Sequence, residues 1–290
     1  MLHMAALVAL ADERVLRKAA DVRRLPREHA NEKIAVQLEG IIVYDVAQHV
    51  TPGFIMLDDT GGVYVNAEGE KRWTVGDQVV ITGETGLGNY ATVARLKTIT
   101  RVGRSELPRG RSVTAEEIAS GKCDYQRVCI RGVVITTYKD RADPLWTWMI
   151  VKTETAAVSV ACIGPAEKTD VLRRYVDAAV EIEGVCIPFC NVRSEFLGAR
   201  INIQDCSEIR VLQPPHEDPF EAPMLETTHL LHLTSRSPIL HRRCVKGTVT
   251  ALCANKGFFM LVDEKGLFVS TVCTNHPAVG EMVEVSGFLD

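Results

Sequence analysis

The chain has 290 residues, of which 46% are hydrophobic and 24% are charged. This composition is typical of globular proteins and excludes a fibrous or wholly disordered chain, and the length suggests two or three domains. The net charge of −4, from 33 basic and 37 acidic side chains, lacks the basic excess that phosphate backbones usually require. Composition therefore does not indicate nucleic acid as the first partner. The sequence also contains no apolar run long enough to span a membrane as a helix.

The N-terminal segment, residues 1–33, begins with a short apolar stretch. Residues 4–11 read MAALVALA, and the Ala-Leu-Ala at 9–11 fits the pattern at which secretory signals are cleaved. The stretch is typical either of the end of a signal peptide or of an ordinary amphipathic helix, and both interpretations stay open. The first predicts a periplasmic or other extracytoplasmic location; a cytoplasmic location is the alternative.

One strand pattern occurs three times along the chain. Each copy opens with an alternating strand around a central glycine, and the three openings are VQLEGIIVY (36–44), VCIRGVVIT (128–136) and RCVKGTVTA (243–251). A glycine inside a strand marks a bend or a close backbone approach, so we expect Gly40 and Gly132 at equivalent bends. The expected core positions beside these two glycines are Val36, Leu38, Ile42, Val128, Ile130 and Val134.

Further strands follow each opening in the same order. The segments 53–66, 145–163 and 257–272 read as strand hairpins, and 75–83, 176–184 and 279–287 read as fourth strands. A fifth strand is expected at 92–102 and at 199–212. The third copy stops before such a strand, so we expect its barrel to be incomplete and the sequence to be a fragment.

Five short strands with a bent first strand and an excursion between strands three and four describe an OB-fold barrel. We therefore predict an all-β fold with short helices, made of tandem five-stranded OB-fold barrels of which the third is incomplete. Helices are expected at 165–177 and after the capping box that begins at Thr114. The expected domains are an N-terminal segment (1–33), OB-fold 1 (34–104), a linker with a short helix (105–124), OB-fold 2 (125–212), a Pro-rich acidic strap (213–241) and OB-fold 3 (242–290).

Catalytic motifs are missing from the sequence, which contains no GxSxG, HExxH or P-loop pattern. We therefore expect no enzyme activity and no cofactor. We also expect no metal site, because no nearby residue completes a metal-ligand pattern with His229 and His232 in the sequence. Asp58 and Asp59 precede a Thr-Gly-Gly, where aspartate favours a turn; a cation contact is the alternative. The nine cysteines are spread out without a CxxC pair, so we expect buried, isolated thiols and no disulfide framework.

Aromatic side chains on strands two and three are the best ligand candidates, because OB barrels bind ligands there. In the second repeat, Trp146 and Trp148 share one strand face, and Lys139 and Arg141 lie in the preceding loop. Packing in the barrel core is the alternative for these rings. In the first repeat the candidates are Tyr44, Phe54, Tyr64, Trp73, Tyr90 and Arg95.

The segments GFIMLDDTGGVYV, WTVGDQVVITGETGLGNYA and VTAEEIASGKCDYQRVCIRGVV give the chain a family resemblance. It resembles the tandem OB-fold regions of certain bacterial sensor proteins, which lie between a signal peptide and a transmembrane helix followed by a histidine kinase or diguanylate cyclase. The resemblance implies a non-enzymatic sensory input module for a small molecule, glycan or protein ligand, with any kinase or cyclase encoded downstream. The alternative is a single-stranded nucleic-acid-binding protein.

Overall fold

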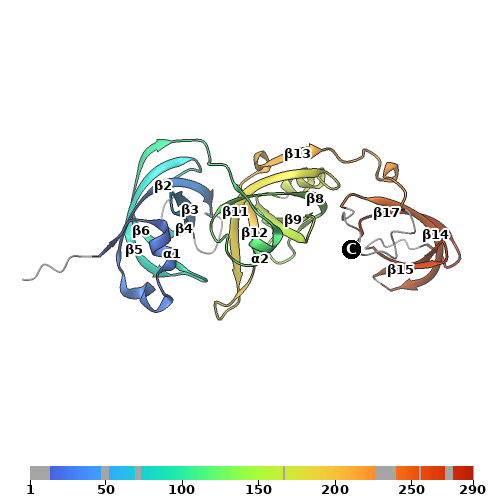
Figure 1. Cartoon of the computed structure of the whole chain (residues 1–290), viewed down its shortest axis with the longest axis horizontal. Coiled ribbons are helices and arrows are strands. Elements are labelled where there is room, and N and C mark those ends of the chain that lie inside the picture. The colour runs from blue at the N-terminus through green and yellow to red at the C-terminus, as the bar shows by residue number, and fades with distance from the viewer. Residues whose placement is uncertain are drawn as a thin grey trace, which may run out of the picture. The chain divides into compact units, whose positions relative to one another are not determined.

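The computed structural model describes residues 14–46, 52–68, 73–165, 167–225, 240–254, 256–271 and 277–289. Three sheets dominate it, one in each predicted repeat (Figure 1). The chain divides into two compact units, one made of residues 1–129 with 183–208 and the other of 130–182 with 209–290. The three sheets are described one by one below.

The first sheet closes into a barrel. Its strands are β1 (Val15–Leu16), β2 (Ala35–Asp45), β3 (Gly53–Asp58), β4 (Gly61–Asn66), β5 (Asp77–Leu87) and β6 (Thr92–Arg104). The order is β1-β2-β3-β4-β6-β5, and β2 also pairs with β5, so that five strands form a ring. Inward-facing side chains such as Leu38, Phe54 and Ile81 are fully buried inside the ring.

The segment before the first barrel belongs to its core. After β1 come the helix α1 (Ala19–Arg24) and the 3-10 turn η1 (Arg27–Glu32), and the side chains of Leu16, Ala19 and Val22 join the barrel's buried cluster. The backbone N–H of Ala19 donates to Asp58 Oδ2 at 2.7 Å, which caps the start of α1. Residues 19–24 of this segment are helical, whereas the MAALVALA stretch, to which the signal-peptide and helix interpretations apply, lies outside the described residues.

The second sheet repeats the same ring. Its strands are β7 (Arg111–Ser112), β8 (Arg127–Lys139), β9 (Trp146–Lys152), β10 (Ala157–Ile163), β11 (Ala179–Cys190), β12 (Phe196–Ile203) and β13 (Ile209–Gln213). The order is β13-β11-β12-β10-β9-β8-β7, with an additional β11–β8 pairing, so β8 to β12 close as the strands of the first barrel do. The predicted helices are present as α2 (Ala115–Ala119), which has its Thr114 capping box, and α3 (Glu167–Arg173).

The prediction of one continuous fifth strand over 199–212 in the second repeat is wrong. A 3-10 turn, η2 (Cys206–Glu208), divides it into β12 and β13, and β13 pairs with β11. Side chains stabilise the interruption: Asp205 Oδ1 accepts from the backbone N–H of Ser207, and the Glu208 carboxylate forms an ion pair with buried Arg127. Polar side chains that bond to nearby backbone compete with a strand ladder, which explains the break.

The third sheet has four strands in the order β16-β15-β14-β17. They are β14 (Arg243–Cys253), β15 (Gly257–Val262), β16 (Lys265–Ser270) and β17 (Met282–Gly287), and the 3-10 turn η3 (Pro219–Glu221) precedes them. The first four strands of the other two barrels are paired in the same order, β4-β3-β2-β5 in the first and β10-β9-β8-β11 in the second. The fold is therefore all-β and built from OB-fold barrels, as the sequence predicts.

The strand-one glycines occupy equivalent positions in all three sheets. A Cβ atom on Gly40, Gly132 or Gly247 would lie 2.2, 2.4 or 2.4 Å from a backbone carbonyl oxygen of strand two. The strand that carries each glycine also has a β-bulge two to four residues later, between Ile42 and Tyr44 in the first repeat. The six predicted core positions beside Gly40 and Gly132 are all buried, which confirms the repeat alignment.

Candidate ligand-binding sites

The outer face of the first barrel is apolar and is covered by a later part of the chain within the same unit. Ile55 on β3 and Tyr64 on β4 are cross-strand partners that face outward, and they pack against Tyr125, Val185 and Ile187. A Cβ atom on Gly62 would lie 1.8 Å from the carbonyl oxygen of Tyr125, so only glycine allows this close approach. The face on which OB barrels commonly bind ligands is thus partly closed here.

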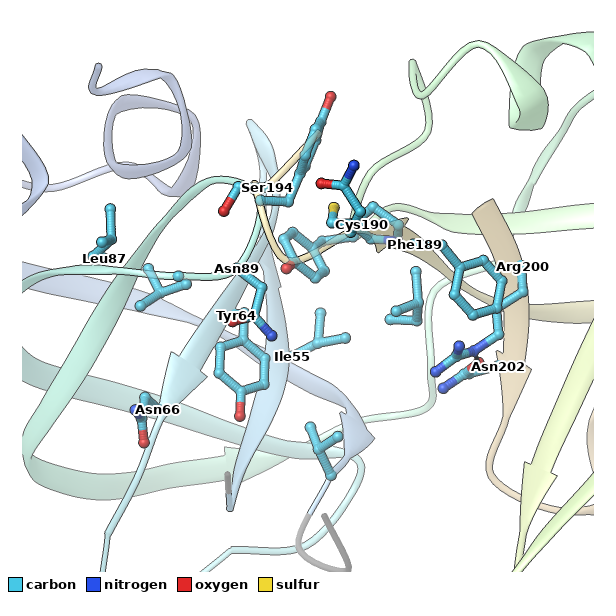
Figure 2. Close-up of a pocket in the computed structure, with 18 of the residues that line it drawn as sticks. Ile55, Tyr64, Asn66, Leu87, Asn89, Phe189, Cys190, Ser194, Arg200 and Asn202 are labelled. Carbon is cyan, nitrogen blue, oxygen red and sulfur yellow. Dashed lines mark hydrogen bonds between the residues drawn. The ribbon is translucent and has the colours of Figure 1, made fainter. Parts of the chain in front are cut away.

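The uncovered part of this face forms a cavity of about 580 Å³, within the usual range for ligand pockets (Figure 2). We call it the barrel-1 cavity. Strands β3 to β6 and the loop between β5 and β6 line one side, and β11, β12 and the turn that joins them line the other. The lining residues are Val46, Ile55, Tyr64, Asn66, Leu87, Gly88, Asn89, Tyr90, Val93, Tyr125, Ile187, Pro188, Phe189, Cys190, Asn191, Val192, Ser194, Arg200 and Asn202.

Four aromatic rings and four asparagine side chains are among the residues that line the barrel-1 cavity. The rings of Tyr64 and Tyr125 lie 6.3 Å apart, centroid to centroid, at an interplanar angle of 31°. On the other side, the Arg200 guanidinium lies 4.4 Å from the centroid of the Phe189 ring, which is a cation–π distance. None of the described lining residues is an aspartate or a glutamate. The cavity therefore suits a neutral or anionic group better than a cation.

A hydrogen-bonded chain fixes one end of the barrel-1 cavity. Arg200 Nε donates to Asn202 Oδ1 at 2.7 Å, and Asn202 Nδ2 donates to the Tyr44 hydroxyl at 3.1 Å. Burial lowers the pKa of Arg200 to about 10, so its side chain stays charged at neutral pH. Because Tyr44 is 1% exposed, it acts as a support for Asn202 and is not itself open to a ligand.

Arg27 holds the two loops at the mouth of the barrel-1 cavity. Its Nη1 donates to the carbonyl oxygens of Gly88 and Tyr90, at 2.8 and 3.1 Å, and its Nη2 donates to Ser194 Oγ at 3.1 Å. The Tyr90 ring in turn packs on Phe196 with a centroid distance of 5.6 Å. These contacts join the β5–β6 loop to the β11–β12 turn, and loops that are already held in this way lose less entropy on binding.

Burial also shifts ionisation around the barrel-1 cavity. It raises the pKa of Tyr64 to about 12 and raises that of Tyr125 further, so both phenols are neutral hydrogen-bonding groups. Burial raises the pKa of the neighbouring Asp124 to about 6, although Arg23 opposes the shift. Asn66 Oδ1 is buried and has no hydrogen-bond partner among the described residues.

The outer face of the second barrel carries a different aromatic surface, in the second unit. Tyr138 on β8 pairs directly with Trp148 on β9, so the two side chains lie side by side on that face. The rings of Trp146 and Trp148 are stacked at 23° with centroids 6.0 Å apart, as the predicted shared strand face requires. Trp146 is 7% exposed and Tyr138 is 45% exposed, so Trp146 supports the surface from beneath. We call Tyr138, Trp146 and Trp148 the barrel-2 aromatic surface.

Asp140 orients the barrel-2 aromatic surface. Its Oδ2 accepts a 2.7 Å hydrogen bond from Trp148 Nε1, while Oδ1 accepts from the backbone N–H groups of Ala142 and Asp143. These bonds, the one from Asp143 first, lower the pKa of Asp140. The neighbouring Lys139 and Arg141 side chains are exposed and form no ion pair with a described residue. The orientation of the Trp148 indole is thus held by a hydrogen bond. Lys139 is the last residue of β8, not a loop residue as predicted, and Arg141 lies in the loop that follows.

The remaining candidates of the first repeat do not line the barrel-1 cavity. Phe54 and Trp73 lie in the barrel core, where their rings pack with centroids 5.0 Å apart, and Trp73 Nε1 donates to Asp45. Arg95 is exposed on β6. Of the six predicted side chains, only Tyr64 and Tyr90 line the cavity. Sequence reasoning missed Arg200, Asn202 and Asn66, although the polar Arg-x-Asn pattern on a buried strand is a signal that could have indicated the first two.

Asp58 and Asp59 form the predicted turn. Asp58 Oδ1 accepts from the backbone N–H groups of Thr60 and Gly61, and Asp59 pairs with Lys18. Within the described ranges, no group of three His, Cys, Asp or Glu side chains could hold a metal ion; His229 and His232 lie outside those ranges. The eight described cysteines are free thiols, five of them buried, which confirms isolated cysteines for that part of the chain.

No protein-family model matches the sequence, and no curated protein matches it. Solved structures match parts of it. A putative aspartyl-tRNA synthetase from Leishmania major Friedlin is 15% identical, with 41% of this chain and 24% of that chain covered and a TM-score of 0.30. Asparaginyl-tRNA synthetase from Pyrococcus horikoshii is 18% identical, with 42% and 30% covered and a TM-score of 0.30. A murine DNA binding protein bound with ds DNA is 10% identical, with 61% and 98% covered and a TM-score of 0.32.

This chain spans less than a third of the length of either synthetase. A likeness at this level carries no function across, so the function has to be inferred from the side chains of this chain. The tandem OB-fold part of the resemblance to bacterial sensor proteins is confirmed by the three sheets, whereas the link to a kinase or cyclase stays a prediction. Among the described residues, no helix is both long and apolar enough to cross a membrane.

Proposed function

We propose that this chain is a non-enzymatic binding module and that the barrel-2 aromatic surface binds single-stranded nucleic acid. The observation that supports this most is the pairing of Tyr138 with Trp148 on the outer face of a closed OB barrel; two exposed cations, Lys139 and Arg141, follow Tyr138 in the sequence. Aromatic side chains stack on bases of any sequence, and flanking lysine and arginine contact the phosphates. Every base has a planar face, so a fixed indole ring provides a platform for one base.

The net charge of the chain does not oppose this proposal locally. Asp140, the acidic residue closest in sequence to the two cations, is held by Trp148 and by two backbone N–H groups. Lys139 and Arg141 therefore remain available to a phosphate backbone. The segment 139–143 carries two cations and two carboxylates, so attraction to a polyanion depends on the reach of these two cations and not on a local excess of positive charge.

The test is fluorescence anisotropy with a labelled single-stranded oligonucleotide longer than the ~4–16 nucleotides that an OB fold covers. Trp148→Ala should weaken binding by about 5-fold to about 150-fold, the range that corresponds to one stacked base. Phe220→Ala, which removes a 53% exposed ring outside the three sheets, is the matched control and should leave the affinity for the oligonucleotide unchanged. Affinity weaker than about 100 µM at low salt, where non-specific binding is strongest, would remove the proposal.

The two cations allow a second measurement. Lys139→Ala with Arg141→Ala should reduce the slope of log affinity against log salt by about 0.7 for each lost phosphate contact. Arg109→Ala with Lys122→Ala removes the same charge from two exposed positions of the first unit. This control should leave the slope unchanged; an equal change in both double variants would mean that only total charge matters.

A second candidate function is the sensory input module that the sequence resemblance implies, with an extracytoplasmic location. The barrel-1 cavity favours it, because a concave pocket with aromatic side chains suits a small ligand better than a polymer. Expression of the gene with its own upstream sequence, followed by cell fractionation, separates the two candidates. Recovery of an unprocessed protein in the cytoplasm would exclude the sensory candidate.

A further inference from the structure

The barrel-1 cavity presents flat apolar surfaces from two sides. Tyr64 projects from β4, with Tyr125 beside it, and Phe189 projects from β11 on the far side of the cavity (Figure 2). Arg200 lies against the Phe189 ring and fixes its position. Aromatic side chains prefer offset-stacked or edge-to-face contact with other rings. These rings offer surfaces on which a planar ring can pack.

The barrel-1 cavity contains both hydrogen-bond donors and hydrogen-bond acceptors. Asn66 Oδ1 is a buried acceptor without a partner among the described residues, and a buried polar atom of this kind is costly until a donor reaches it. Asn202 and Arg200, joined by a 2.7 Å hydrogen bond, lie at the opposite end in Figure 2. A ligand that carries an N–H donor and also a ring or carbonyl acceptor can use both ends.

Three ligand classes fit the lining less well. Cations and amines would meet no carboxylate, because no described lining residue is acidic. Aliphatic chains would leave the buried Asn66 Oδ1 without a partner, which makes lipids poor ligands. Free sugars would replace ring stacking with hydroxyl groups that the isoleucine, valine and leucine side chains cannot satisfy.

We propose that the barrel-1 cavity binds one neutral planar heterocycle that carries both a hydrogen-bond donor and an acceptor, of the nucleobase or nucleoside class. The inference uses the cavity of the first unit alone. It stands whether or not the barrel-2 aromatic surface in the second unit binds nucleic acid. Neither the size nor the charge of the cavity requires a phosphate on the ligand.

Isothermal titration calorimetry on the full chain tests the proposal with adenosine, guanosine, cytidine and uridine as probes, and with ribose and indole as matched arms. At least one nucleoside should bind with a Kd below about 1 mM, and Asn66→Leu should weaken it by about 5-fold to about 100-fold. Asn31→Leu, at an exposed position of η1 in the same unit, is the matched control and should bind as the unmodified chain does.

A second variant keeps the test valid if Asn66→Leu does not fold. Leu87 lines the cavity and is 42% exposed, so Leu87→Trp fills the mouth without disturbing the barrel core. It should abolish nucleoside binding, whereas Trp148→Ala in the second unit should leave it intact. The inference is overturned if no nucleoside binds at about 1 mM, if ribose or indole binds as tightly as the nucleosides, or if Leu87→Trp still binds.

Discussion

Substitution of the strand-one glycines by alanine tests the repeat architecture directly. In Gly40→Ala the new Cβ would lie 2.2 Å from the carbonyl oxygen of Leu57 and 2.9 Å from the end of the Met56 side chain. The methionine can move, but the carbonyl belongs to the strand that pairs with Ile41 through the ladder of β2 and β3. Relief of the overlap therefore has to separate two paired strands.

The expected cost follows from these contacts. Overpacking costs about 1–3 kcal/mol, and the loss of about one ladder hydrogen bond adds about 1 kcal/mol, so we expect about 2–4 kcal/mol for Gly40→Ala. The same range applies to Gly132→Ala and Gly247→Ala, whose Cβ atoms would lie 2.4 Å from the carbonyl oxygens of Lys152 and Leu261. Gly266→Ala is the matched control, because no atom lies within 4 Å of its Cβ position.

Hydrogen exchange followed by mass spectrometry is the suitable assay, since a single melting temperature is not well defined for a chain with several domains. Amide exchange in β2 and β3 should accelerate by about 30-fold to about 900-fold in Gly40→Ala, as 2–4 kcal/mol requires. Peptides of the third sheet should respond to Gly247→Ala and remain unchanged in Gly266→Ala. Unchanged protection of β2 and β3 in Gly40→Ala, or a response to only one of the three glycine variants, would refute the equivalence of the repeats.

Two further predictions concern the first unit. Asp58→Ala should destabilise β3, β4 and α1 by about 2 kcal/mol, because the carboxylate both forms the turn and caps the helix, whereas Asp59→Ala, which loses only an exposed ion pair, should change exchange in α1 little. Burial raises the pKa of Asp124 from 3.8 to about 6, so the folded state holds a proton that the unfolded state has released. This contribution to the free energy of unfolding is present below about pH 4 and is lost as the pH rises through about 6; urea titrations should show it, and Asp124→Asn should abolish that pH dependence.

The alternating strands and the strand-one glycines were sufficient to predict the barrels from the sequence. Local signals of this kind act within a few residues, as the Thr114 capping box and the Asp58 turn also do. The split of the second repeat's fifth strand was not predictable in the same way. Besides the local bond between Asp205 and Ser207, it involves the ion pair between Glu208 and Arg127, which lie 81 residues apart in the sequence.

The barrel-1 cavity illustrates the same limit for function. On β4 the alternation places Val63 and Val65 inward and Tyr64 outward, so the strand pattern alone separates Tyr64 from a core aromatic. The β-bulge between Ile42 and Tyr44 on β2 shifts that alternation, which is why Tyr44 could not be assigned to a face from the sequence. The strand pattern therefore assigns Tyr64 to the outer face correctly and leaves the face of Tyr44 undetermined.

The other wall of the cavity depends on contacts that no strand pattern encodes. Tyr125 reaches the outer face of β4 because Gly62 carries no side chain, and the β11–β12 turn stays in place because Arg27 bonds to both loops at the cavity mouth. None of these residues stands out in the sequence by itself: Gly62 belongs to a predicted turn, Tyr125 begins the second repeat, and Arg27 lies near the N-terminus. They create a cavity only together, and for that reason a ligand site on an OB barrel has to be sought where another segment covers the outer face, as well as where aromatic side chains are exposed.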